Sequence, residues 1–186
     1  MTIKLAVSGS AGTGKSSLAM ALSKSLNLPY LEESFRSRCE DGLVFQDLSR
    51  AAQSLLIVEL YSEAIDQVTK CSDGFVQDRC PIDFLAFWLH YGFWNEEKSS
   101  KDLFKRVQKD LSYYDRIIML PWGVFDIQED GVRSTNCWLQ LKFQSLVEGL
   151  VNRLAPKDLI YWMPNDIDVR QERVDHVHNI INFEKN

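Results

Sequence analysis

Long apolar runs, positive charge and paired cysteines are all scarce in this sequence, and each scarcity excludes a class of protein. The longest apolar run is about six residues, around positions 84–89, whereas a transmembrane helix needs about 20. We therefore expect no membrane-spanning segment. The net charge of −5 argues against a protein that wraps nucleic acid, because that function usually requires a basic face. This net charge does not exclude a basic cleft on one part of the surface.

Metal sites and disulfides also lack support in the composition. The sequence has four widely spaced cysteines, Cys39, Cys71, Cys80 and Cys137, and no CxxC pair. This usage is typical of reduced thiols in a cytosolic protein and not of a disulfide framework or a zinc site. The chain runs from Met1 directly into an apolar strand, so we expect no secretory signal and predict a cytoplasmic location.

The length and balance of the chain are those of one globular domain. It has 186 residues, of which 45% are hydrophobic and 25% are charged. A chain of this length can bury one sizeable core. Because no internal repeat or linker-like stretch interrupts it, we predict a single domain over residues 1–186.

A glycine-rich segment carries the strongest signal in the sequence. Residues 9–16 read GSAGTGKS, which matches the phosphate-binding loop pattern GxxxxGK[ST]. Such a loop turns successive backbone N–H groups inward as a nest for anions. Lys15 would then reach the β- and γ-phosphates, and the hydroxyl of Ser16 would ligate Mg²⁺. We predict that ATP phosphates are bound by Gly9, Ser10, Ala11, Gly12, Thr13, Gly14, Lys15, Ser16 and Ser17.

The flanks of this segment decide between a phosphate loop and an ordinary glycine-rich turn. An apolar run over residues 3–7 precedes it and is suited to a buried parallel strand. An amphipathic helix pattern beginning at Lys15 follows it directly. Strand, loop and helix in this order are the context that the motif requires, so we favour the phosphate loop.

Strand-like and helix-like segments alternate along the rest of the chain. The expected strands are 3–8, 29–32, 74–78, 115–120 and 158–162, and the expected helices are 15–26, 44–70, 81–92, 98–113, 136–154 and 169–182. This alternation predicts an α/β fold of the three-layer P-loop NTPase type, with a five-stranded parallel sheet and helices on both faces. The polar segment at about 121–135 has no clear period, and we interpret it as a lid-like loop.

Ligands in such sheets bind beyond the carboxyl ends of the strands, so polar residues just after each strand are candidates. Glu33 and Arg36 follow the second strand and share a helical face at a spacing of i and i+3. They are candidate substrate-binding residues. A surface ion pair explains the same spacing equally well.

The third strand ends in the sequence QDRCPID. Asp78 is placed to hold Mg²⁺ or to accept a proton from an attacking hydroxyl, so we predict a catalytic and metal-binding role. Arg79 and Asp83 are candidate substrate-binding residues. The structural alternative for Asp78 is a cap on the helix that begins at Pro81, and both roles can hold together.

The lid-like segment contains EDGVRS at residues 129–134. Phosphotransferases must keep water from the transferred group, and an arginine brought over the phosphates neutralises charge at the same time. Arg133 is therefore a candidate catalytic residue. A turn at Asp130–Gly131 with a solvated arginine is the alternative. We assign the aromatic stripe of Phe87, Tyr91 and their neighbours to the core.

Together these motifs resemble a known group. GSAGTGKSSLA, LEESFR, QDRCPIDFLAF, DRIIMLP and EDGVRS occur in the order seen in small P-loop proteins related to the ribosylnicotinamide kinase domain of NAD-biosynthesis regulators. The wider group is described as AAA-type ATPase domains. The resemblance covers about residues 3–180 and implies that Glu33, Arg36 and Arg79 face the acceptor. The Gln77-Asp78-Arg79 strand end is closer to thymidylate and deoxynucleoside kinase patterns than to ribosylnicotinamide kinases.

These observations predict an ATP- and Mg²⁺-dependent phosphotransferase that acts on a nucleoside, a nucleotide or a related small metabolite. Two alternatives remain. One is a nucleotide-dependent binding switch, and the other is a kinase of a modified base in DNA. The sequence is also compatible with a homodimer.

Overall fold

The computed structural model describes residues 2–125 and 135–183. Its centre is a five-stranded parallel sheet in the order β2-β3-β1-β4-β5. The strands are β1 (Lys4–Ser8), β2 (Tyr30–Leu31), β3 (Phe75–Asp78), β4 (Arg116–Met119) and β5 (Ile160–Trp162). The predicted α/β class and five-stranded parallel sheet are confirmed.

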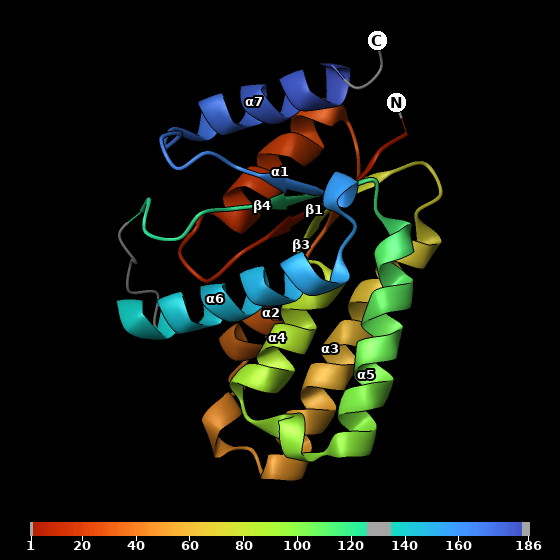
Figure 1. The fold of residues 1–186 in the computed structure, drawn as a ribbon, viewed down its shortest axis with the longest axis vertical. Helices are drawn as coiled ribbons and strands as arrows, with labels where there is room; N and C mark the ends of the chain where they lie inside the picture. The colour runs from red at the N-terminus through yellow and green to blue at the C-terminus, as the bar shows by residue number, and fades with distance from the viewer. Residues whose placement is uncertain (1, 126–134, 184–186) are drawn as a thin grey trace.

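Helices cover both faces of the sheet (Figure 1). They are α1 (Lys15–Leu26), α2 (Phe35–Glu40), α3 (Arg50–Lys70), α4 (Pro81–His90), α5 (Glu97–Asp110), α6 (Cys137–Leu154) and α7 (Arg170–Phe183). Helices α1 and α7 lie together on one face, while α3, α4, α5 and α6 pack on the other. Among the described residues, no helix combines the length and the apolar character that crossing a membrane requires.

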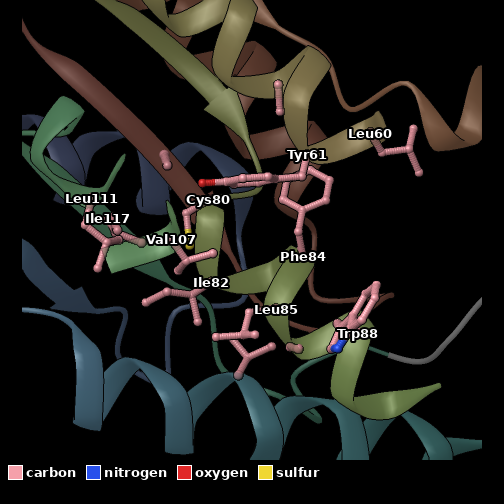
Figure 2. Packing of buried hydrophobic residues seen from close by; sticks show 14 of the residues in the cluster. Leu60, Tyr61, Cys80, Ile82, Phe84, Leu85, Trp88, Val107, Leu111 and Ile117 are labelled. Atoms are coloured by element: carbon pink, nitrogen blue, oxygen red, sulfur yellow. The ribbon is translucent and has the colours of Figure 1, made fainter. Parts of the chain in front are cut away.

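Alternating strand side chains divide the core into two clusters, because successive residues of a strand point to opposite faces. On β1, Leu5 and Val7 join the cluster with α1 and α7, whereas Ala6 joins the larger cluster on the other face. Figure 2 shows part of this larger cluster, where Tyr61 of α3, Phe84 of α4 and Val107 of α5 lie close together. The carboxyl ends of β1 and β3 lie side by side because the two strands pair in parallel, with Val7 opposite Asp78.

Several predicted boundaries were wrong. The helix expected over 44–70 is split into a 3₁₀ turn (Phe45–Asp47) and α3, because Leu48 is extended and Ser49 caps α3 by accepting a hydrogen bond from the amide of Ala52. The short helix α2 was not among the predicted helices, and because it begins at Phe35, Glu33 and Arg36 do not share a helical face as predicted. The last turn of the helix expected over 98–113 is instead a 3₁₀ turn (Leu111–Tyr113), and β5 begins later than expected, at Ile160.

Gly74, directly before β3, offers a test of how closely the backbone packs at the start of this strand. Its φ is +101°, and a Cβ there would lie 2.6 Å from the carbonyl oxygen of Ile3. We expect Gly74→Ala to lower the free energy of unfolding by about 2–4 kcal/mol, since backbone strain and a backbone clash add together.

Gly42→Ala is the matched control for Gly74→Ala. Gly42 has a φ of +100°, but no atom lies within 4 Å of its Cβ position, so only the strain of about 1–2 kcal/mol remains. Urea unfolding of both variants measures the difference. Equal losses would show that the contact with Ile3 does not constrain this turn.

Candidate active site

The phosphate loop joins β1 to α1 in the conformation that the motif predicts. Gly9, Gly12 and Gly14 have φ values of 141°, 81° and 88°, which residues with a Cβ rarely adopt. Gly14 is the N-cap of α1, and no side chain caps this helix end. The amides of the first turn of α1 are therefore without a side-chain cap, and the dipole of the helix would favour an anion there.

Side chains distant in the sequence hold this loop from two sides. On one side, the Oε1 atom of Gln144 accepts a hydrogen bond from the amide of Ser10 (2.7 Å), and its Nε2 atom donates to the carbonyl of Leu120 (3.0 Å). On the other, Arg173 of α7 donates from Nη1 to the carbonyl of Thr13 (2.9 Å). Helices α6 and α7 thus fix the loop, and the motif alone did not indicate either contact.

Lys15 is buried at the first position of α1. Its Nζ atom donates a 2.6 Å hydrogen bond to the carbonyl of Ser10, and its side chain lines a cavity. Burial, together with the nearby positive charge of Arg79, lowers the pKa of Lys15 to about 8. An anion bound at the loop would offset both effects, because negative charge favours the ammonium form.

Asp78 lies directly beside the loop, because β1 and β3 are paired with Val7 opposite Asp78. Its Oδ2 atom accepts a 2.5 Å hydrogen bond from the hydroxyl of Ser16. Its Oδ1 atom is buried and makes no hydrogen bond within the described part of the chain, although the hydroxyl of Tyr30 lies near the same carboxylate. A buried carboxylate oxygen without a partner costs free energy, so this atom is suited to a ligand.

Arg79 adopts a conformation that is uncommon for a residue with a side chain. Its φ is 76°, and its amide donates to the carbonyl of Val7 (2.9 Å). Its guanidinium lies 3.5 Å from the carboxylates of both Glu33 and Asp83 and 4.7 Å from the ring of Phe87. Burial opposes its charge, but the neighbouring carboxylates outweigh this and raise the pKa of Arg79. Strained positions of this kind cluster at functional sites.

Asp83 contacts Arg79 from the buried side of the site. It is fully buried, and its Oδ2 atom accepts hydrogen bonds from the hydroxyl of Ser8 (2.7 Å) and the amide of Cys80 (2.8 Å). It does not line the cavity. The structure therefore gives Asp83 a supporting place, where the sequence predicted contact with substrate.

Glu33 lines the same cavity as Lys15 and Ser16 of the phosphate loop. Its Oε1 atom accepts a hydrogen bond from the amide of Phe35 (2.9 Å), and its side chain is only 10% exposed. Burial raises the pKa of Glu33, and the positive charge of Arg79 opposes this shift. The result is a partly desolvated carboxylate beside an arginine.

The predicted residues meet in one cavity of about 470 Å³, which lies at the carboxyl edge of the sheet. Seven of them line it: Ala11, Lys15, Ser16, Glu33, Arg36, Asp78 and Arg79. Arg133 lies outside the described residues and stays a prediction. No group of three or more His, Cys, Asp or Glu residues that could hold a metal occurs within 2–125 and 135–183.

Sequence reasoning missed most of the cavity's far wall. This wall is aromatic, and its residues come from α2, from the 3₁₀ turn that precedes α3, from the end of α4 and from α6. They are Phe35, Phe45, Phe87, His90, Tyr91 and Phe143. Phe87 and Tyr91 belong to the stripe that we assigned to the core, yet both are only partly buried. Their helical spacing gave no signal of this, because a core stripe and a cavity wall have the same periodicity.

Comparison with known proteins agrees with this geometry. A family model described as an AAA domain matches residues 4–163. The chain belongs to this AAA domain family. The comparison with curated proteins found no match.

Solved structures of several kinases share the fold of this chain. Deoxyadenosine kinase from M. mycoides matches with a TM-score of 0.72 and 14% identity, over 97% of this chain and 98% of that one. Thymidylate kinase from Ehrlichia chaffeensis matches with a TM-score of 0.63 and 13% identity, over 97% and 98% of the two chains. At this identity the likeness shows the fold, which is that of P-loop kinases.

A NadR protein in complex with NR also matches, with a TM-score of 0.64 and 18% identity. The match covers 96% of this chain but only 49% of the NadR chain, so this protein corresponds to about half of that one. The resemblance to a domain of NAD-biosynthesis regulators is confirmed at the level of the fold.

Proposed function

We propose that this protein is a Mg²⁺- and ATP-dependent kinase that transfers the γ-phosphoryl group to a hydroxyl of a small-molecule acceptor. One observation carries the proposal: Lys15 and Ser16 of the phosphate loop line the same cavity as Glu33, Arg36 and Arg79. A bound acceptor would therefore lie next to the terminal phosphate. A binding switch needs no such cavity beside the phosphates, so this arrangement favours a kinase.

The loop amides and Lys15 would bind the triphosphate. Ser16 and Asp78 would hold Mg²⁺, and the unpartnered Oδ1 atom of Asp78 fits this role. Magnesium usually binds proteins through one or two carboxylates together with substrate phosphates, which matches the lack of a larger cluster in the described chain. When bound, Mg²⁺ would neutralise charge that develops on the phosphates.

Three carboxylates of the described chain line the cavity, and since Glu32 is exposed, Asp78 and Glu33 are the candidates for the general base. Asp78 already accepts a hydrogen bond from Ser16, so it belongs to the phosphate and metal side. Glu33 has no bond to the loop, and its Oε2 atom lies beside Arg79. We assign proton acceptance from the attacking hydroxyl to Glu33, while Arg79 would orient the acceptor and stabilise the charge on the transferred group.

Acceptor-stimulated formation of ADP tests the proposed activity. Purified protein with MgATP should release ADP slowly alone and at least about tenfold faster with a suitable acceptor from a panel of nucleosides, nucleoside monophosphates and hydroxylated carboxylic acids. The phosphorylated acceptor, identified by mass spectrometry, should appear in equal amount. ADP formation that no acceptor of the panel stimulates would contradict the kinase and favour a nucleotide-dependent switch.

A further inference from the structure

Arg173 lies in the first turn of α7 and is a buried cation, only 2% exposed. Its Nε atom donates to the carbonyl of Ile167 (2.8 Å) and its Nη1 atom to the carbonyl of Thr13 (2.9 Å), whereas its Nη2 atom is buried without a hydrogen-bond partner among the residues that the structure describes. No described Asp or Glu forms an ion pair with its guanidinium. Burial lowers the pKa of Arg173, and the charge of Asp168 opposes this shift only in part. A buried cation costs free energy unless an anion offsets its charge.

The guanidinium of Arg173 lies against the part of the phosphate loop from which α1 starts. A Cβ at Gly14, the N-cap of α1, would be 3.5 Å from the Nη1 atom of Arg173 and 3.3 Å from the ring of Phe125. The same ring lies 4.6 Å from the guanidinium carbon. Gly14, Phe125 and Arg173 are thus packed together. The charge of Arg173 lies at the end of α1 where the helix dipole favours an anion.

The hydrogen bond from Arg173 to Thr13 also sets the direction of the next amide. In a planar trans peptide, the C=O of one residue and the N–H of the following residue point to opposite sides. Because Arg173 holds the C=O of Thr13 toward α7, the N–H of Gly14 points away from α7. An anion nest requires successive N–H groups that turn toward one point. Arg173 therefore orients an amide of the loop from outside the nest.

We propose that Arg173 is a positioning residue of the phosphate site, which orients the loop through Thr13 and whose charge is offset when the phosphates of a nucleotide bind on the opposite side of the loop. The proposal rests on the proposed function, because it takes the ligand of the loop to be a nucleotide. Binding of the phosphates and docking of α7 are then coupled. Such coupling is reciprocal, so each can be measured through the other.

Calorimetry on an arginine variant tests the role of Arg173 without turnover. Arg173→Met keeps the apolar stem and removes the guanidinium, and it should weaken the binding of MgADP about tenfold or more, as expected for a lost charged hydrogen bond. Magnesium tripolyphosphate, which has no base or sugar, should lose affinity by a similar factor. Arg170→Met is the matched control, because Arg170 is exposed in the same turn of α7. A loss confined to MgADP, or equal affinities in both variants, would overturn the proposal.

A lysine variant separates the cation from simple packing. Arg173→Lys keeps the positive charge and one donor for the carbonyl of Thr13, although it lacks the planar fork that reaches Ile167 as well. It should bind magnesium tripolyphosphate several-fold more tightly than Arg173→Met does. Binding no tighter than in the methionine variant would contradict a role for the charge. If Arg173→Met folds poorly, the comparison of Arg173→Lys with the native protein still measures the loss.

Hydrogen exchange tests the same coupling from the side of α7. Bound MgADP should slow amide exchange in α7 in the native protein and in Arg170→Met, and this protection should be lost in Arg173→Met. A methionine variant that unfolds at a lower temperature but keeps native affinity and protection would show a structural role alone and overturn the proposal. If the native protein shows the coupling but transfers no phosphoryl group to any acceptor, the result would support the role of Arg173 and reject only the kinase.

Discussion

Replacing Lys15 by methionine is expected to reduce phosphoryl transfer by at least about 10³-fold, because a triphosphate bound at the loop would lose the ammonium that we propose lies nearest its terminal phosphates. Methionine keeps the apolar stem of the side chain. It removes only the charge and the 2.6 Å hydrogen bond to the carbonyl of Ser10. Steady-state rates of phosphorylated product at saturating acceptor measure the loss.

The fold should not suffer from this change. The pKa of Lys15 is lowered to about 8 by burial and by the charge of Arg79, from an unfolded value near 10.5. Its ammonium form therefore opposes folding at pH values below about 8, and this penalty disappears as the pH rises from about 8 to 10.5. At pH 7, Lys15→Met should have a free energy of unfolding no lower than that of the native protein.

The same pKa predicts how nucleotide binding depends on pH. Above about pH 8 the free protein loses the Lys15 proton, whereas bound phosphates favour the ammonium form, so the affinity for MgATP should fall there. Lys15→Met should show no such fall. Lys24→Met is the control, since Lys24 is exposed on the same helix. Transfer that persists in well-folded Lys15→Met would contradict the proposed role of the loop.

Replacing Glu33 by glutamine is expected to lower kcat by about 10²–10⁴-fold, the range typical of a lost general base. Glutamine can still accept the hydrogen bond from the amide of Phe35, so the local backbone should be kept. In the native protein, burial raises the pKa of Glu33, and the proposed base must be in its carboxylate form to accept a proton. The acidic limb of the kcat profile should therefore lie above the usual range for glutamate, and it should vanish in Glu33→Gln.

Two further variants define the outcome for Glu33. Glu40→Gln is the matched control, because Glu40 is exposed at the end of α2 and does not line the cavity. Asp78→Asn should mainly raise the Mg²⁺ concentration needed for half-maximal rate, because Asp78 is bonded to Ser16. If Asp78→Asn removed the acidic limb and Glu33→Gln retained it, the two assignments would be reversed.

The parts of the site that could be predicted from the sequence are those in which neighbouring residues act together. The phosphate loop, the strand before it and the helix after it form one local unit, and the structure has all three. Asp78 and Arg79 were identifiable because the end of a parallel strand is the edge where ligands bind. The confirmed sheet followed from the alternation of apolar runs and amphipathic helices.

Local signals failed where a side chain's surroundings come from distant segments. The break before α3 was missed because Phe45 is buried against the rings of Phe35 in α2 and of Tyr91 just after α4, and these contacts override local helical preference. Asp83 looked like a substrate contact, but the hydroxyl of Ser8 and the amide of Cys80 bind its carboxylate.

The sequence by itself determined the phosphate loop, because a glycine-rich turn between strand and helix has the same form in any context that allows the elements to pack. Only the tertiary structure decided the shape and chemistry of the cavity beside the loop, where we propose that the acceptor binds. Its walls come from α1, α2, α4 and α6, and about 40 residues or more separate α2 from α4 and α4 from α6. Whether a given aromatic ring faces the core or the cavity depends on how these helices pack against one another, and periodicity along a single helix carries no information about that choice.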